Sequence, residues 1–245
     1  MDHESWIAIG GPGEEVGLTA SAASVEICVR IQHHPSRAGL PRRLIQHLGA
    51  FEDVEVIPDP EPNGILDAWR AHRACLESIS EGATHMLLLQ DDALPVQRFG
   101  SYLCDAVEQE PKAVLCAFAP GFKYIALEMT RATRARVSFA PLRVGAFVPC
   151  VAIVYPREFI VGLLDWIDHR SSDRQKTRLR GADDGVLAIY CRQKRIEPLL
   201  IVPSIVEHDE TLQSVGKTHR RPGPHRRAAL LQKADVISDV AVRPV

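Results

Sequence analysis

The chain has 245 residues, 46% of them apolar and 24% charged, which suits one large domain or two small ones with a sizeable core. Its net charge of −2 gives no overall field directed at nucleic acid or a membrane. No apolar run approaches the roughly 20 residues of a membrane-spanning helix, and the N-terminus MDHESW has no signal-peptide features. The six cysteines are scattered and never form C-x-x-C, so we expect a reduced, cytoplasmic protein without a structural zinc.

Strands and helices are predicted to alternate through the first half of the chain. Residues 1–23 have no sustained periodicity and are expected to form a loose arm. Apolar runs then predict strands, and residues at helical spacing predict a helix after each of the first three. The expected strands are 25–32, 53–59, 86–92 and 113–119, and the helices open near Pro41, Asn63 and Val96. This alternation is typical of a parallel sheet built from βαβ units.

The second half is less regular. We expect a connection holding a strand or two over 120–145, then a strand over 148–156 and a helix over 157–168. The polar, basic stretch 169–181 is predicted to be a mobile loop. The last expected elements are a helix from Asp183 to about Lys194, a strand over 196–204 that leads to His208, and a helix over 226–236.

The most informative stretch is THMLLLQDDALP at 84–95, where an apolar run enters Gln90, Asp91 and Asp92. Such a run is typical of a buried strand, and the carboxyl ends of strands are where open α/β sheets bind their ligands. Two adjacent carboxylates there must be neutralised, and a hard divalent cation that carries phosphate oxygens does so. A solvated Asp pair that opens a turn is the alternative.

Three short motifs follow one another in order: DDA after the apolar strand, Asp183-Asp184 at a helix start, and VPSIVEH at 202–208. Together they resemble the GT-A-type glycosyltransferases, in particular the lipooligosaccharide-type enzymes with their EDDA motif and their late strand ending P-S-x-x-x-H. The resemblance covers roughly 25–216. It implies an α/β, Rossmann-like, mostly parallel sheet flanked by helices, in one catalytic domain (24–216) with a nucleotide-sugar half (24–120) and a less regular acceptor half (121–216), followed by a basic C-terminal segment and helix (217–245).

The same resemblance implies a metal and a donor. Asp92, Asp91 and His208 would hold Mn²⁺ or Mg²⁺, and Gln90 stands where the family has an acid and would contact the donor ribose. The donor would be a nucleotide sugar, with a UDP-sugar expected. Its further contacts would come from Pro35, Ser36 and Arg37 over the base or phosphates, and from Asp59 on uracil or ribose. The diphosphate would be met by Lys217 and by Arg73, with Arg70 as the alternative to Arg73.

Asp183 and Asp184 are the candidates for the acceptor side. An inverting enzyme needs a carboxylate that removes the acceptor hydroxyl's proton, and Asp184 is favoured over Asp183 for that part. The capping of helix N–H groups is the structural explanation for the same pair. Likewise, the HHPSR stretch at 33–37 has an alternative as a surface turn, Asp59 as a turn residue before a proline, and His208 as a structural histidine.

Basic residues are concentrated in three stretches that hold 14 of the 29 Lys and Arg: Arg131, Arg134, Arg136 and Arg143; Arg170, Arg174, Lys176, Arg178 and Arg180; Lys217, Arg220, Arg221, Arg226 and Arg227. They are either solvated loops or the binding surface for a polyanionic acceptor, such as hydroxymethylated DNA or a phosphorylated glycan. The expected activity is therefore a metal-dependent hexosyl- or pentosyltransferase. Its rivals are a nucleotidyltransferase and a nucleic-acid-binding or interaction protein with an inactive fold of this type.

Overall fold

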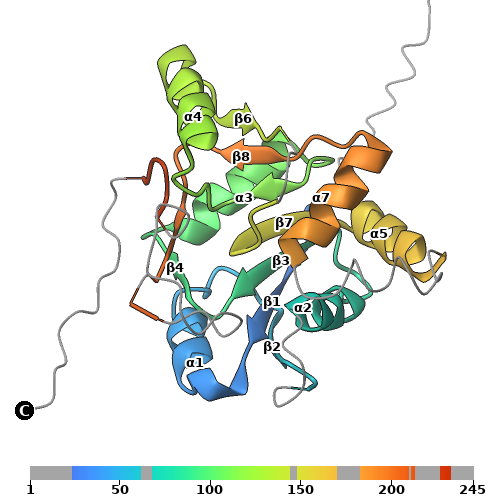
Figure 1. The fold of residues 1–245 in the computed structure, drawn as a ribbon. Coiled ribbons are helices and arrows are strands. Elements are labelled where there is room, and N and C mark those ends of the chain that lie inside the picture. Colours follow the sequence, from blue (N-terminus) through green and yellow to red (C-terminus); the bar gives the residue numbers. More distant parts are fainter. Residues whose placement is uncertain are drawn as a thin grey trace, which may run out of the picture.

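The computed structural model describes residues 24–61, 68–143, 148–169, 183–209, 211–212 and 227–232. The expectations for the arm 1–23, for nearly all of the loop 169–181 and for Lys217 lie outside these residues. Within them the chain is an α/β protein with a mostly parallel central sheet flanked by helices, as the sequence predicts (Figure 1).

The central sheet has seven strands in the order β2-β1-β3-β7-β5-β8-β6. β1 pairs in parallel with β2 and β3, and β5 pairs in parallel with β8, whereas β7 and β6 run antiparallel to their neighbours. Five strands therefore share one direction. The strands are β1 Ile27–His33, β2 Val54–Pro58, β3 His85–Gln90, β5 Leu115–Cys116, β6 Phe139–Pro141, β7 Ala152–Pro156 and β8 Leu199–Ile201.

A second, two-stranded sheet continues from the end of β3. It consists of β4 (Ala93–Pro95) paired antiparallel with β9 (Val206–His208). β4 follows the acid pair of the DDA motif directly, and β9 is the end of the VPSIVEH motif. The two motifs, more than a hundred residues apart in the sequence, therefore meet in this small sheet.

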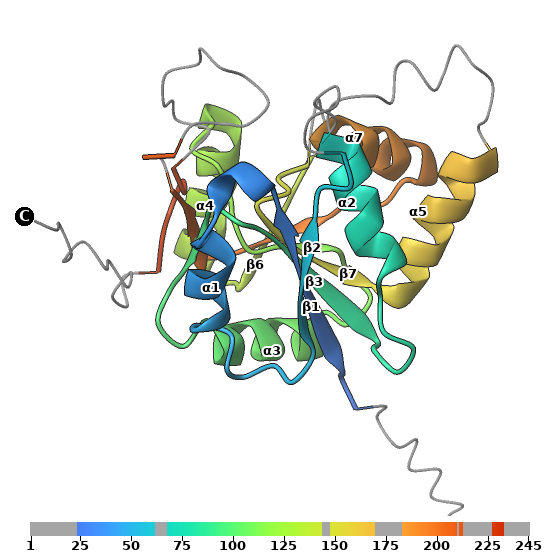
Figure 2. The same cartoon turned by 90° about the horizontal axis from the view of Figure 1, so that it is seen from below.

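Helices cover both faces of the central sheet (Figure 2). α1 and α3 pack on one face, whereas α2, α5 and α7 pack on the other, together with α4. β3 is buried on both sides, since Met86 and Leu88 contact the second group and Leu87 and Leu89 the first. The helices are α1 Leu40–Ile45, α2 Ala68–Glu77, α3 Phe99–Gln109, α4 Lys123–Ala135, α5 Arg157–His169 and α7 Asp183–Lys194, with a 3-10 turn, η1, at Pro35–Arg37.

One charged side chain is buried on the second of these faces. Arg30 of β1 is 2% exposed. Its guanidinium donates to Asp53 Oδ1 at 2.9 Å, to the main-chain oxygen of Ser78 at 3.0 Å and to Ser80 Oγ at 2.6 Å. A buried charge is tolerated when it is paired and hydrogen-bonded, as it is here, so Arg30 joins β1 to the loops on either side of it.

One sequence-based expectation is incomplete and another is wrong. The connection 120–145 holds an expected strand, β6, but also the helix α4, whose buried residues are Ile125, Met129 and Ala132. The helix expected over 226–236 is not one in its described part, 227–232, where Ala228 bridges to Pro120 and Leu231 to Ser204. Main-chain hydrogen bonds to these distant segments, such as that from Ala229 N to Ala119 O at 2.7 Å, take the place of helical ones.

Among the described helices, none has both the length and the apolar character that crossing a membrane requires.

Candidate active site

The two acids of the DDA motif lie buried at the carboxyl end of β3. Asp91 and Asp92 are each 3% exposed. The main-chain N–H of Asp91 donates to Gln32 O at 3.0 Å, which extends the pairing of β3 with β1 by one residue. Because the chain then turns into β4, both carboxylates remain at the sheet edge at which β1 and β3 end.

Residues that follow β1 hold this acid pair. Arg37 Nη1 lies 2.6 Å from Asp91 Oδ1 and 2.8 Å from Asp92 Oδ2, so one guanidinium bridges both carboxylates. His33 Nδ1 and the main-chain N–H of His34 both contact Asp91 Oδ2, at 2.9 and 3.0 Å. Pro35 and Ser36 are exposed at the same edge. Arg37, expected on the donor phosphates, thus lies against the acids themselves.

His208 reaches Asp92 because of the small sheet. Ala93 and His208 are partners in the β4–β9 pair, and the main-chain N–H of Asp209 donates to Asp92 O at 2.9 Å. His208 Nε2 consequently lies 3.2 Å from Asp92 Oδ2. Burial opposes the ionisation of Asp92, yet the contacts with His208 and Arg37 outweigh it and lower the pKa of this carboxyl to about 2. Asp92 is therefore ionised at neutral pH.

This cluster offers carboxylate oxygens and an imidazole nitrogen, which are donor types that divalent cations bind. Asp92 Oδ1 and His208 Nδ1 are buried and have no hydrogen-bond partner among the described residues. Leaving a buried carboxylate oxygen without a partner costs free energy, and a cation would satisfy it. Carboxylate oxygens suit Mg²⁺ and Mn²⁺, and an imidazole nitrogen extends the donor set toward transition metals. Asp92, Asp91 and His208 are the residues that would hold the ion.

The start of α7 lies beside the same edge. Gln90 Nε2 donates to Asp183 Oδ2 at 3.3 Å, and Asp184 O accepts from Val148 N at 3.1 Å. Asp183 is buried, whereas Asp184 is half-buried, and its Oδ1 accepts from Gly185 N at 2.7 Å. An acid in place of Gln90 would face the carboxylate of Asp183, so the amide here removes a like-charge repulsion.

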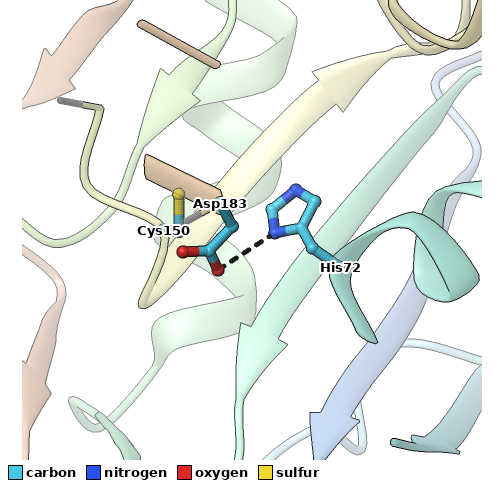
Figure 3. A group of neighbouring side chains, drawn as sticks. All are labelled: His72, Cys150 and Asp183. Atoms are coloured by element: carbon cyan, nitrogen blue, oxygen red, sulfur yellow. Dashed lines mark ion pairs between the residues drawn. The ribbon is translucent and has the colours of Figure 1, made fainter. Parts of the chain in front are cut away.

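Behind Asp183 lies a histidine of α2. His72 of α2 is fully buried, with Nε2 3.0 Å from the Tyr155 hydroxyl and Nδ1 3.4 Å from Asp183 Oδ2. Burial opposes the ionisation of Asp183, but His72 and main-chain N–H groups at the start of α7 lower the pKa of this carboxyl. Figure 3 shows Cys150 on the other side of Asp183. Burial raises the pKa of the Cys150 thiol well above its usual value, as does the nearby Asp183.

Two residues predicted to contact the nucleotide-sugar donor, Asp59 and Arg73, form ion pairs within the protein. Asp59 lies at the same edge, since its N–H donates to His33 O at 2.8 Å, but Arg70 Nη2 takes up both carboxylate oxygens, at 2.9 and 3.1 Å. Arg73 pairs with Glu77 at 2.7 Å and with Asp168 of α5 at 2.9 Å. The structure therefore does not bring the Arg73 guanidinium to Asp91 and Asp92. Lys217, the remaining donor residue, is outside the described part of the chain.

Sequence reasoning missed two members of the edge. His33 belongs to the HHPSR stretch but was not singled out. Asp209 is buried next to His208 and binds Arg43 at 3.3 Å and Thr211 Oγ1 at 2.6 Å. Burial opposes the ionisation of Asp209, whereas Thr211 and Arg43 lower the pKa of its carboxyl. The one signal available for these residues was their position at strand ends.

No family model and no curated protein sequence matches this chain. Fold and site define a class: an α/β protein with a mostly parallel, helix-flanked sheet and a buried carboxylate–histidine cluster at the carboxyl edge of its strands.

Proposed function

We propose that the protein is a metal-dependent glycosyltransferase of the GT-A type that moves a sugar from a nucleotide-sugar donor to a hydroxyl acceptor. The observation that carries this proposal is the meeting of two distant motifs in the β4–β9 sheet. It brings His208 Nε2 to 3.2 Å from Asp92 Oδ2, and Asp92 Oδ1 and His208 Nδ1 are buried with no hydrogen-bond partner in the described part of the chain. This is the arrangement expected where a cation and the diphosphate of a donor bind, and a UDP-sugar is the first donor to test.

The residues around the cluster have different proposed roles in binding the nucleotide-sugar donor. A divalent cation, when bound, would act as a Lewis acid on the departing diphosphate. Asp92, Asp91 and His208 would hold it, the two acids supplying the negative charge that balances it. Arg37 Nη1 lies within 2.8 Å of both acids, which holds the guanidinium at the edge where the donor phosphates would bind.

Asp184 is the residue proposed to take the proton of the acceptor hydroxyl. Its neighbour Asp183 points inward to His72 and Gln90, whereas Asp184 is half-buried and so can meet an acceptor. Its position at the N-terminus of α7 favours the carboxylate form, because the helix dipole stabilises negative charge there. Asp183 then serves to fix the start of the helix against β3.

The acceptor is proposed to carry several negative charges, as hydroxymethylated DNA or a phosphorylated glycan would. Of the three basic stretches, the one at 131–143 is largely described, and Arg131, Arg134, Arg136 and Arg143 in it are all exposed. Binding that depends on neutralised phosphates weakens steeply with salt. A loss of acceptor affinity on raising the salt concentration from 50 to 200 mM would support this acceptor class, and a flat response would remove it.

A second candidate is a binding protein of the same fold without catalysis. It is favoured by the Arg37 guanidinium, which bridges Asp91 and Asp92 and so neutralises part of their charge without any metal. In that case the acid pair would serve only to place Arg37 at the edge of the sheet.

A thermal-shift screen separates the two candidates. UDP-, GDP-, CMP- and dTDP-sugars are each tested with Mn²⁺ and with EDTA, because a ligand of the folded state raises the melting temperature by mass action. We expect a shift with one nucleotide class that EDTA abolishes and that Asp92→Asn loses, whereas the exposed control Asp105→Asn retains it. Turnover of that donor then tests catalysis. No shift with any donor would refute the glycosyltransferase proposal.

A further inference from the structure

Three buried donor atoms of different chemistry face one another behind the sheet edge (Figure 3). They are a ring nitrogen of His72, the sulfur of Cys150 and a carboxylate oxygen of Asp183, and all lie within 4.8 Å of one another. The residues come from α2, from the segment that enters β7 and from the first position of α7. All three side chains are buried.

His72 and Asp183, which form an ion pair, also have the separation of two ligands of one ion. His72 Nδ1 lies 3.4 Å from Asp183 Oδ2, yet this nitrogen is buried and makes no hydrogen bond to a described residue. On a tetrahedral zinc, with bonds of about 2.0–2.3 Å, two ligand atoms are separated by about 3.4–3.6 Å. The nitrogen and the oxygen already have that separation, and the sulfur needs only a small inward movement.

Neighbouring groups hold two of these ligands in orientation. The Tyr155 hydroxyl lies 3.0 Å from His72 Nε2. In the tautomer with the proton on Nε2, that N–H donates a hydrogen bond to the hydroxyl, and Nδ1 presents its lone pair to the cluster. Asp183 Oδ1 accepts from Asp184 N at 2.9 Å, so that Oδ2, which also accepts from Gln90 Nε2 at 3.3 Å, lies toward His72. Partners of this kind orient the ligands of protein metal sites.

The charges of the group also match a divalent ion. A thiolate and a carboxylate carry two negative charges, which a divalent cation balances in a place where uncompensated charge is costly. Cys150 now donates its thiol proton to Val148 O at 3.1 Å. Metal binding would form a sulfur–metal bond and release that proton to water. Sulfur and nitrogen ligands select Zn²⁺-like ions over Mg²⁺ or Ca²⁺.

We propose that His72, Cys150 and Asp183 form a second, buried cation site for a divalent transition metal of the Zn²⁺ class. It is distinct in chemistry from the oxygen-rich cluster of Asp91 and Asp92, and it does not depend on the glycosyltransferase proposal. The ion would join α2, the start of β7 and the start of α7. The sequence gives no C-x-x-C signal for it, because each ligand comes from a different part of the chain.

The test uses the full chain, prepared without a polyhistidine tag and without chelator. Zinc bound after dialysis is measured by mass spectrometry, and the ion is then exchanged for Co²⁺, which gives a thiolate-to-cobalt charge-transfer band when sulfur is a ligand. We expect stoichiometric zinc and this band in the unmodified protein. We expect Cys150→Ser to lose the band, and the buried control Cys191→Ser and the other-site variant Asp92→Asn to keep it.

Two results would overturn the proposal. One is an unmodified protein that retains no zinc and shows no charge-transfer band with added Co²⁺. The other is a band that persists in Cys150→Ser, which would assign the thiolate to another cysteine. Should Cys150→Ser fail to fold, His72→Gln replaces it, and the measurement on the unmodified protein stands by itself.

Discussion

Replacing Asp92 by Asn tests whether the charge of this buried carboxylate stabilises the fold by itself. The pKa of Asp92 is about 2 in the folded chain against an ordinary value of 3.8. A depressed pKa means that the ionised form stabilises the folded state above pH 3.8, and that this stability is lost as the pH falls toward 2. A difference of about two pKa units corresponds to a contribution on the order of 2 kcal/mol to the free energy of unfolding at neutral pH.

Asp92→Asn should therefore lower the free energy of unfolding by roughly 2 kcal/mol at pH 7, or the melting temperature by about 4–8 °C in a chain of this size. The difference from the parent should shrink toward zero near pH 2. Denaturant unfolding in EDTA, followed from pH 7 down to pH 2, measures it without any contribution from a bound cation. The exposed Asp105→Asn serves as the control. A variant as stable as its parent at pH 7, or one less stable by the same amount at every pH, would refute the electrostatic argument.

Three further substitutions test other parts of the structure. Asp184→Asn should leave the Mn²⁺-dependent donor shift intact and lower kcat by about 100-fold or more, since a positioned general base contributes 10²–10⁴; an unchanged kcat in steady-state assays would exclude that role. Arg30→Met should lower the free energy of unfolding by at least about 2 kcal/mol in urea, because it removes charge-assisted bonds to Asp53 and to nearby loop oxygens. Gly100→Ala should lower the melting temperature, since an added Cβ would lie 2.5 Å from Cβ of Ala50. A raised melting temperature would mean that the segment around Ala50, between α1 and β2, moves aside without cost.

The elements that the sequence predicts well are those with a complete local signal. β3 is an example, because an apolar run buried on both faces and ended by two acids has few other interpretations. The meeting of Asp92 and His208 was predicted from two motifs, and the structure places these side chains 3.2 Å apart. Their role as metal ligands stays a prediction.

What the sequence could not predict depends on distant parts of the chain. α4 is an exception, because its buried residues Ile125, Met129 and Ala132 recur at helical spacing and the prediction for 120–145 overlooked this signal. Residues 227–232 form main-chain hydrogen bonds with Ala119, Gly121 and Ser204. Such bonds do not require particular side chains, so they cannot be predicted from the residue types. The His72 cluster combines three segments whose proximity only the folded sheet creates.

The position of β7 in the sheet also determines when the central sheet can be completed during synthesis of the chain. β3 and β5 both lie in the first 120 residues, yet β7, from the second half, is the strand inserted between them. During synthesis on the ribosome both strands therefore expose an unpaired edge until β7 has emerged, and such edges promote association between chains. Residues 24–120 on their own would lack the strand that joins β3 to β5, so any split version of this protein should keep β7 with them.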